Sequence, residues 1–483
     1  MDPQTDRFQN SFNGFPVLAL WQGANPGEVA DRISAYRNEA EISYDGSGAL
    51  TRLSAGSLER LAEEGRTGIF RAAATAYTES EFADKLSRME DRIRKNPEKP
   101  FSFPAAGMFY GSGDRAGRLA FLFPGQGSQY PGMGGPLAGA FPAACRVWEE
   151  LGSMRFSGKS IREVVFPDEP SGPQDANAAF IRLSSADWTN ACISVAAEAV
   201  LALFERMGVF PDAVGGHSFG DISAFRAAGV FGPEDMIRHA RYRGELGVNC
   251  PKTTTGCILV VPDNAENSRK ILKKAAVENV WIANYNAPDQ TVLAGVKEDV
   301  FRAGKAFEEH GISAKTMPIS GAPHCPLIED VAREFHEYLA EAELRPAGCD
   351  IYSFLFGRKI DNDPAVFRKV LKAHIEKPVR FMQMIENMYK DGVRIFVEIG
   401  PANVLASMVG RILGTRPHAA FATDHRKADP VLVFLNTVAG LFKEGLVSDP
   451  AVLIQEFSAH GSEGSLPAAG QNGVSGFALD QSV

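Results

Sequence analysis

The sequence lacks several patterns that would assign it to other classes of protein. Its six cysteines contain no Cys-x-x-Cys pair, which argues against a zinc site or a disulfide framework and indicates the reduced thiols of a cytoplasmic protein. No apolar run approaches the roughly 20 residues that span a bilayer. The amino terminus, MDPQTDRFQN, is polar and has no apolar core of a secretory signal. We therefore expect a cytoplasmic protein with no membrane partner.

Basic clusters are missing as well. Lysine and arginine are scattered, and the formal net charge is −9, so no basic stripe is available to engage the phosphates of a nucleic acid. A small anionic substrate remains compatible with this charge, because one well-placed cation suffices to bind it.

What the sequence does contain is a succession of α/β units. A chain of 483 residues has room for several domains. Turn-rich and polar stretches divide it into a tail (1–15), a small α/β unit (16–115), a large unit in two pieces (116–255 and 325–440), an inserted unit (256–324) and a C-terminal linker (441–483).

The order of predicted elements indicates how the two larger units fold. Strand and helix alternate from Leu119 to Gly229, which predicts a parallel sheet covered by helices. In the inserted unit, GCILVV, NAENSRKILKKAA, VWIANYN, QTVLAG, KEDVFRAGKAFEEHG and SAKTMPIS predict the order βαββαβ, which is typical of a ferredoxin-like unit.

The stretch VGGHSFGDISAFRAAG has a serine in the pattern Gly-x-Ser-x-Gly, with Ser218 at its centre. This spacing presents a nucleophile on a strand-to-helix elbow in one group of folds, but glycine and serine also form ordinary turns. A serine nucleophile needs a base. His217 is adjacent, but on a turn it points away and is better read as structural. His324, directly after the inserted unit, lies where two units would form a cleft. The other histidines fall in helical or polar stretches and are expected at the surface: His239, His310, His336, His418, His425 and His460.

Two main-chain groups are candidates to stabilise an oxyanion. The N–H of Phe219 directly follows the serine, and the glycine-rich loop Gly125–Gln129 follows a strand and could bring a second N–H alongside. An ordinary turn explains that loop equally well.

Six segments together resemble one family. FLFPGQGSQ, GHSFG, RYRG, NYNAPDQ, ISGAPHC and FVEIGPANVL occur in the order and spacing of malonyl-CoA:acyl carrier protein transacylases and of the acyltransferase domains of polyketide and fatty acid synthases. The resemblance covers Leu119 to about Gly440. The region from about Phe15 to Gly113 resembles the linker subdomain that precedes the acyltransferase in multidomain synthases. GHSFGD is similar to the motif of iterative enediyne or polyunsaturated fatty acid synthases.

The resemblance implies a fold and a set of roles. It implies an α/β-hydrolase-like large subdomain with an inserted ferredoxin-like subdomain. Ser218 would be acylated, with His324 as its base, and the N–H groups of Gln126 and Phe219 would form the oxyanion hole. Arg243 would bind the carboxylate of a malonyl group through two N–H groups, a contact that lysine cannot reproduce.

Further positions are implied with less definite roles, and two depart from the family pattern. His217 and Asn286 join the substrate-binding candidates, although a packing role for Asn286 is equally compatible. The family orients its histidine through the backbone carbonyl of a Gln or Asn four residues before the PVRF proline, and here that residue is His374. Pro323 stands where many malonyl-specific domains have phenylalanine, which leaves methylmalonyl as an alternative.

The sequence thus predicts an acyltransferase of polyketide, antibiotic or fatty acid biosynthesis. It would move a malonyl group from coenzyme A, through a serine ester, to the phosphopantetheine thiol of an acyl carrier protein, with no metal or other cofactor and with a neighbouring ketosynthase if it is part of a synthase. Two rivals remain, an α/β-hydrolase and a docking module without catalysis. The hydrolase would need an acidic residue to orient the histidine and an HGGG-type loop, and the sequence has no such loop.

Overall fold

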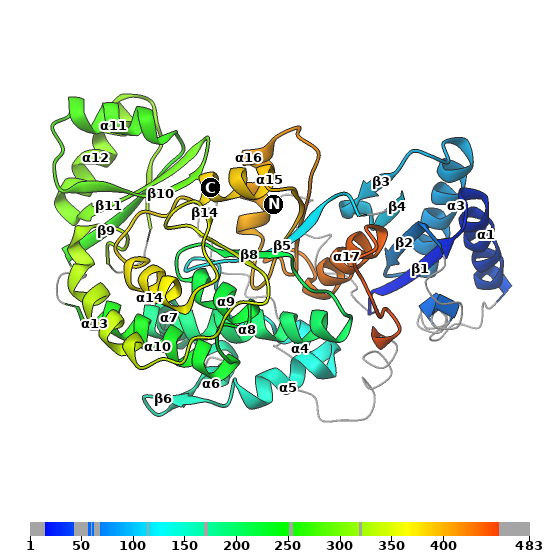
Figure 1. Ribbon diagram of the computed structural model, residues 1–483, viewed down its shortest axis with the longest axis horizontal. Helices are drawn as coiled ribbons and strands as arrows, with labels where there is room; N and C mark the ends of the chain where they lie inside the picture. The colour runs from blue at the N-terminus through cyan, green and yellow to red at the C-terminus, as the bar shows by residue number, and fades with distance from the viewer. Residues whose placement is uncertain are drawn as a thin grey trace.

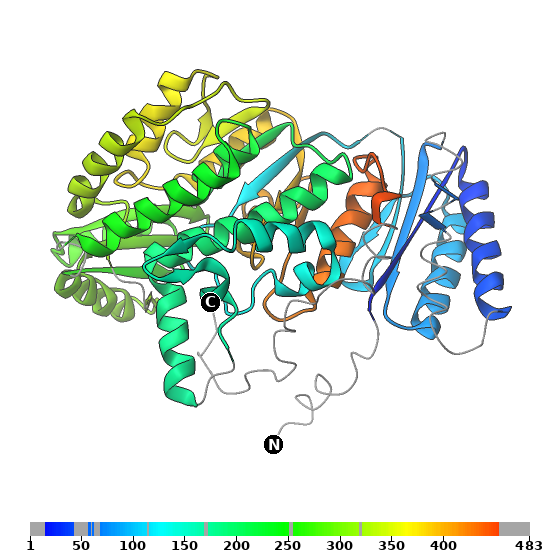
Figure 2. The ribbon, with the colours of Figure 1, turned by 90° about the horizontal axis from the view of Figure 1, so that it is seen from below.

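Three sheets of four to six strands follow one another along the molecule in the computed structural model (Figures 1 and 2). The N-terminal sheet, in blue, lies at one end, and the inserted unit, in green, lies at the other end in Figure 1. The structure describes residues 15–42, 57–58, 60–61, 68–113, 115–168, 172–250, 255–317 and 321–453. Most of both predicted tails lies outside the described residues.

The N-terminal unit is an antiparallel sheet with helices on one face. Asn25 accepts a hydrogen bond from the N–H of Glu28 at 2.9 Å and so caps the start of the first helix. The strand order is β1-β2-β4-β3. Its elements are β1 (Val17–Gly23), α1 (Pro26–Ile42), β2 (Phe70–Ala76), α3 (Glu79–Lys95), β3 (Phe101–Phe103) and β4 (Met108–Ser112).

The central sheet has the order β14-β13-β8-β5-β15-β16, and all its neighbours are parallel except β13 and β14. This agrees with the predicted parallel sheet. Its strands are β5 (Arg118–Phe123), β8 (Ala213–Gly216), β13 (Asp350–Ser353), β14 (Arg358–Lys359), β15 (Val393–Glu398) and β16 (Ala419–Ala422). The main helices around it are α4 (Gly135–Ala140), α5 (Pro142–Glu150), α6 (Ile161–Val165), α7 (Pro173–Ser184), α8 (Ala186–Arg206), α9 (Gly220–Ala227), α10 (Pro233–Asn249), α13 (Glu329–Ala340), α14 (Pro364–Ala373), α15 (Phe381–Lys390), α16 (Val404–Leu413) and α17 (Pro430–Lys443).

Both faces of this sheet are buried, which the strand sequences explain. In β5, Leu119, Phe121 and Phe123 join the core around α8, while Ala120 and Leu122 join a second core with α15 and α16. Successive side chains of a strand point to opposite faces, so an uninterrupted apolar run fits a strand that is covered on both sides.

The inserted unit has the predicted βαββαβ order, with strands in the spatial order β10-β11-β9-β12 and all pairs antiparallel. Among the described residues of its last predicted strand, Lys315 and Thr316 pair with β9, and positions 318–320 lie outside the described residues. Its elements are β9 (Gly256–Val261), α11 (Ala265–Lys274), β10 (Val280–Ala287), β11 (Gln290–Val296), α12 (Lys297–Glu309) and β12 (Lys315–Thr316).

Helix α17 joins the large unit to the N-terminal sheet. It packs against β2, and its Asn436 accepts a hydrogen bond from the hydroxyl of Thr75 at 2.6 Å. The predicted boundary at residue 441 falls inside α17, which runs to Lys443, and the chain stays packed as far as the buried Leu453. Apolar side chains of the helix end, such as Leu441, bury themselves in the large core.

Helix α8 is an exception to the expectation that no apolar stretch approaches the length of a membrane span. Among the described helices it is the one that is long and apolar enough to cross a bilayer, with 21 residues and a mean hydropathy of 1.2. However, 89% of its apolar window is buried inside the protein. Its composition is therefore accounted for by its place in the core.

The turn after β8 leaves no room for a side chain at Gly216. A methyl group there would lie 2.0 Å from the amide nitrogen of Asp221.

We expect Gly216→Ala to lower the free energy of unfolding by about 1–3 kcal/mol or more, measured by urea denaturation, because the backbone at Asp221 would have to move to make room for the methyl group. Gly410→Ala is the matched control: it lies in α16 with open space around it, so it should stabilise the protein by up to about 1 kcal/mol. Equal effects of the two substitutions would contradict the steric explanation.

Candidate active site

Ser218 lies on a sharp turn between β8 and α9. Its φ is 56°, a left-handed conformation that non-glycine residues rarely adopt. The turn is held at its start by the N–H of His217, which donates to the carbonyl of Phe123 at 2.9 Å, and by the N–H of Gly220, which donates to the carbonyl of His217 at 3.0 Å. The pattern Gly-x-Ser-x-Gly therefore forms an elbow that projects the serine beyond the end of a central strand.

The side chain of Asp221 stabilises this elbow through hydrogen bonds. It is fully buried, and its carboxylate accepts hydrogen bonds from the N–H of Gly216 at 3.1 Å and the hydroxyl of Ser353 at 3.3 Å. Burial raises the pKa of Asp221 well above its ordinary value, while these two bonds and the charge of Arg243 oppose the rise. Asp221 thus links the strained turn to the neighbouring strand β13.

The imidazole of His324 lies within hydrogen-bond distance of the Ser218 hydroxyl. Its Nε2 lies 2.6 Å from the Oγ of Ser218, although 106 positions separate the two residues. Its main-chain N–H donates to the carbonyl of Ile375 at 2.9 Å, and its φ is 63°. The structure therefore brings together the serine and histidine that the sequence singled out.

The ring of His324 is held in one tautomer. Its Nδ1 lies 2.9 Å from the carbonyl oxygen of Lys377, which can only accept, so Nδ1 has the proton and Nε2 is free to accept from Ser218. Burial, followed by the nearby charge of Arg243, lowers the pKa of His324 to about 3. The imidazole is consequently neutral at physiological pH, as a base must be.

The sequence assigns the carbonyl that orients His324 to the wrong residue. The hydrogen bond goes to Lys377, the residue directly before Pro378, and not to His374. The His374 carbonyl contributes only a weaker interaction with the imidazole. Helix α14 ends at Ala373, and the three residues that follow carry the chain past the ring, so the reach of this turn could not be read from spacing.

Arg243 is buried on α10 beside these groups. Its Cζ lies 5.9 Å from the ring centre of Phe219, and its Nε donates a hydrogen bond to Nε2 of His374 at 2.9 Å. Burial lowers the pKa of Arg243 to about 10, and Asp221 opposes that change, so the guanidinium remains charged at neutral pH. A buried cation within electrostatic reach of His324 fits the anion-binding role predicted for it.

The glycine-rich loop lies directly against the elbow. A methyl group at Gly125 would lie 2.6 Å from the carbonyl of His217 and 3.6 Å from Cβ of Ser218. The loop is held by the hydroxyl of Ser128, which donates to the carbonyl of Gly125 at 2.9 Å, and by Arg426, which donates to the carbonyls of Gly127 and Gln129. The start of the loop that contains Gln126 is thus brought next to Ser218.

The remaining predicted residues surround the elbow. His217 donates through Nε2 to Oδ1 of Asn286 at 2.8 Å, and the amide of Asn286 donates to Oε1 of Gln290 at 3.0 Å. This chain ties the elbow to the β10–β11 hairpin, which agrees with a structural role for His217. Pro323 is half-buried directly before His324.

One prediction about the other histidines is wrong. His239 is buried on α10 and hydrogen-bonded to the hydroxyl of Tyr338 at 3.0 Å, instead of lying at the surface. Its helix is enclosed by α8 and α13, which a helical pattern by itself does not reveal. His310 is exposed as expected, His336, His418 and His425 are half-buried, and His460 lies outside the described residues.

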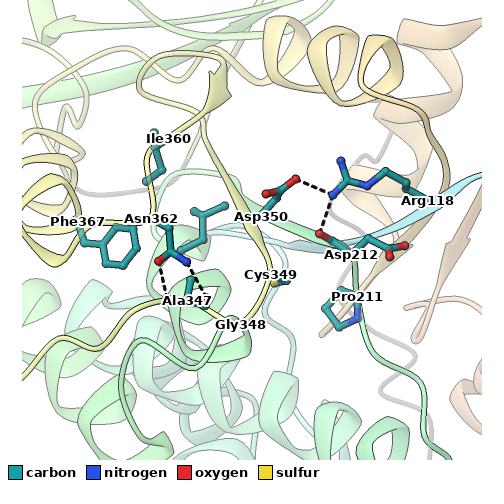
Figure 3. Close-up of a pocket in the computed structure, with 11 residues that line it drawn as sticks. Arg118, Pro211, Asp212, Ala347, Gly348, Cys349, Asp350, Ile360, Asn362 and Phe367 are labelled. Atoms are coloured by element: carbon teal, nitrogen blue, oxygen red, sulfur yellow. Dashed lines mark hydrogen bonds and ion pairs between the residues drawn. The ribbon is translucent and has the colours of Figure 1, made fainter.

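A separate cavity of about 390 Å³ lies at the opposite edge of the central sheet (Figure 3). It is lined where β8 and β13 begin, whereas Ser218 follows the end of β8. Its polar groups bond to one another: Arg118 pairs with Asp350 at 2.6 Å and donates to the carbonyl of Asp212 at 3.0 Å, as Figure 3 shows. These contacts stabilise the edge of the sheet where β8 and β13 begin. The groups with a catalytic geometry lie at the other end of β8, at the elbow.

Comparison with known families now identifies the class of protein. The model of the acyl transferase domain family matches residues 120–432, and the chain belongs to this family. The matched region begins in β5 and ends in α17, so it contains the elbow, His324 and Arg243. The resemblance found in the sequence is confirmed.

Two relatives illustrate the range of the family. The polyketide biosynthesis protein ThaF of Burkholderia thailandensis is 32% identical over 348 residues, which is 72% of this chain and 28% of that protein. The malonyl CoA-acyl carrier protein transacylase of Bacillus subtilis is 30% identical over 307 residues, 61% of this chain and 90% of that protein. The chain thus spans less than a third of the first relative and most of the second.

Solved structures support the fold. The acyltransferase domain of an iterative polyketide synthase in enediyne biosynthesis has a TM-score of 0.69 at 20% identity, covering 90% of this chain and 97% of that one. A malonyl-transacylase in complex with a type II polyketide synthase acyl-carrier protein has a TM-score of 0.58 at 28% identity, covering 66% and 99%. The mixed α/β fold with a parallel sheet is that of acyltransferase domains.

Three functional contacts were not found from the sequence. The carbonyl of Lys377 orients His324, Asp221 binds the elbow, and Arg426 holds the glycine-rich loop. The position of Asp221 inside the serine motif is a signal that could have been used. Neither Lys377 nor Arg426 acts through a local pattern, so the sequence contains no such signal for them.

The low pKa of His324 predicts how the reactivity of Ser218 depends on pH. A base with a pKa of about 3 stays neutral well below pH 6.5, so the rate of Ser218 modification by phenylmethylsulfonyl fluoride should stay nearly constant from pH 8 to 5. The rate is followed by intact mass, with Ser218→Ala as the unreactive control and circular dichroism checking the fold at each pH. A tenfold decrease per unit below a midpoint near 6.5 would show instead an ordinary histidine.

Proposed function

We propose that this chain transfers a malonyl group from coenzyme A to the phosphopantetheine thiol of an acyl carrier protein. The observation that carries the proposal is the 2.6 Å contact between Ser218 Oγ and His324 Nε2, next to the buried charge of Arg243. The Bacillus subtilis transacylase and the structure of a transacylase with an acyl-carrier protein support this choice of substrate and partner.

The first half-reaction forms a serine ester. Oγ of Ser218 attacks the thioester carbonyl while its proton passes to Nε2 of His324, which the Lys377 carbonyl keeps in the accepting tautomer. The negative charge that develops on the carbonyl oxygen is stabilised by the N–H groups of Gln126 and Phe219. When the intermediate collapses, the carbon–sulfur bond breaks and the coenzyme A thiolate takes the proton back from His324.

The second half-reaction runs the same chemistry in reverse. The thiol of the carrier's phosphopantetheine gives its proton to His324 and attacks the ester, and Ser218 recovers its proton as it leaves. Because the chain must favour thiol over water, the groove between the two subdomains needs to be narrow and partly dry. His324 and Ser218 are buried and half-buried respectively, which is compatible with this need.

The acid end of the acyl group is assigned to Arg243. Two N–H groups of a guanidinium match the two oxygens of a carboxylate, and the contact gains strength in a buried site. His217, Asn286 and Pro323 line the proposed acyl pocket. Methylmalonyl remains the alternative, because the compact, half-buried Pro323 takes the place that many malonyl-specific domains give to phenylalanine.

The group that orients His324 argues against the hydrolase alternative. An α/β-hydrolase orients its histidine with a carboxylate, whereas Nδ1 of His324 contacts a main-chain carbonyl.

We further propose that the chain works in the cytoplasm in polyketide or fatty acid biosynthesis, beside a ketosynthase. In this assignment the large subdomain is α/β-hydrolase-like, the inserted unit ferredoxin-like and the N-terminal unit the linker subdomain, and no metal or other cofactor takes part.

Formation of the serine ester tests the reaction itself. Intact-mass analysis after incubation with a panel of acyl-CoAs should show a malonyl adduct that peptide mapping assigns to Ser218, and Ser218→Ala should show none. Addition of a phosphopantetheinylated carrier protein should move the group to the carrier. Release of free malonate without a malonyl-carrier would make the protein a hydrolase, and transfer by Ser218→Ala would exclude the mechanism.

Arg243→Ala tests the recognition of the acid group. Loss of a buried charge pair predicts a decrease of about 100-fold in kcat/KM for malonyl-CoA, with a much smaller change for acetyl-CoA, which has no free carboxylate. Arg238→Ala is the matched control, since Arg238 lies on the same helix and is 57% exposed. Parallel decreases for both substrates would show that Arg243 is needed for the fold instead.

A further inference from the structure

The side chain of His374 holds one edge of the Arg243 guanidinium. Nε of Arg243 donates to Nε2 of His374 at 2.9 Å, and both side chains are buried. Within the part of the chain that the structure describes, this is the one hydrogen bond of the guanidinium. Its two terminal nitrogens, Nη1 and Nη2, are left for another partner.

His374 is itself fixed in the tautomer that this contact needs. Its Nδ1 lies 2.6 Å from the carbonyl of Leu371, which can only accept, so Nδ1 has the proton and Nε2 presents a lone pair to Arg243. The ring also makes edge contacts with Phe335, at 5.7 Å between ring centres, and with Phe354, at 6.4 Å. Main chain and two aromatic rings thus determine where the acceptor points.

We propose that His374 is a positioning residue that orients Arg243 for a carboxylate-bearing acyl group. This inference rests on the proposed function and adds a specificity determinant to it. Holding the guanidinium by Nε presents the Nη1–Nη2 edge as a planar fork, which is the geometry that a carboxylate matches. The orientation is set before the substrate arrives, so less side-chain freedom is lost on binding.

A neutral acceptor suits this place better than an acid. A carboxylate bonded to Arg243 would cancel its charge and compete with the substrate's own carboxylate. Desolvation, followed by the charge of Arg243, holds the pKa of His374 well below its usual value, so the ring stays neutral. The nearby carboxylate of Asp221 is engaged by Gly216 and Ser353 instead. Arg243 therefore keeps its charge for the substrate.

Two substitutions of His374 separate positioning from general structure. His374→Leu fills the site but has no acceptor, whereas an amide oxygen in His374→Gln reaches toward the place of Nε2. For each variant, the rate of Ser218 ester formation is measured by intact mass against the concentration of malonyl-CoA and of acetyl-CoA. Thermal denaturation checks that the variants are folded.

We expect His374→Leu to lower kcat/KM for malonyl-CoA about tenfold, mainly through a higher KM, because one hydrogen bond to a charged group is lost. The preference for malonyl-CoA over acetyl-CoA should fall by the same factor, and His374→Gln should restore most of it. In an Arg243→Ala background, His374→Leu should cause no further loss of preference.

The outcomes distinguish this inference from the proposed function. A Ser218 ester that forms in every variant with an unchanged malonyl-to-acetyl preference would overturn the role of His374 alone. Equal losses for both substrates in His374→Leu, without rescue by His374→Gln, would also overturn it. Absence of any ester in the unsubstituted protein would overturn the proposed function, and the inference with it.

Discussion

The structure depends on one contact between distant parts of the chain, the hydrogen bond that joins Ser218 Oγ and His324 Nε2 at 2.6 Å. Both residues have positive φ values, 56° and 63°, which non-glycine residues adopt only when their surroundings impose them. The elbow imposes the first through close backbone packing at Gly216, and the hydrogen bond from His324 N–H to the Ile375 carbonyl constrains the second. Local strain at the two residues is thereby held in place by the fold.

A short segment after α14 couples this contact to the inserted unit. The carbonyls of Ile375 and Lys377 bind the backbone and ring of His324. Two residues further on, Val379 exchanges hydrogen bonds with β10, receiving one from Tyr285 at 2.8 Å and donating one to Ala283 at 2.7 Å. The same segment therefore orients the imidazole and attaches the inserted unit, so a displacement of that unit would also move the base.

The charges around the elbow are arranged about the buried cation of Arg243. Burial lowers the pKa of His324 and of His374, the charge of Arg243 acts in the same direction, and it opposes the rise in the pKa of Asp221 that burial causes. The two imidazoles stay neutral, and the carboxylate of Asp221 is occupied with the elbow. The positive charge of Arg243 thus remains available to an anionic group, although the protein has a net charge of −9.

Local pattern was sufficient for much of this protein. The apolar run of β5, the βαββαβ order of the inserted unit and the spacing around Ser218 could all be read from the sequence, because strand periodicity and tight turns depend on neighbouring residues. The tertiary structure alone decided that Lys377, and not His374, orients the imidazole, that His239 is buried, and that the His374 side chain reaches Arg243. Those contacts join residues far apart in the chain, and their geometry is set by how helices pack, which residue order by itself does not encode in any local pattern.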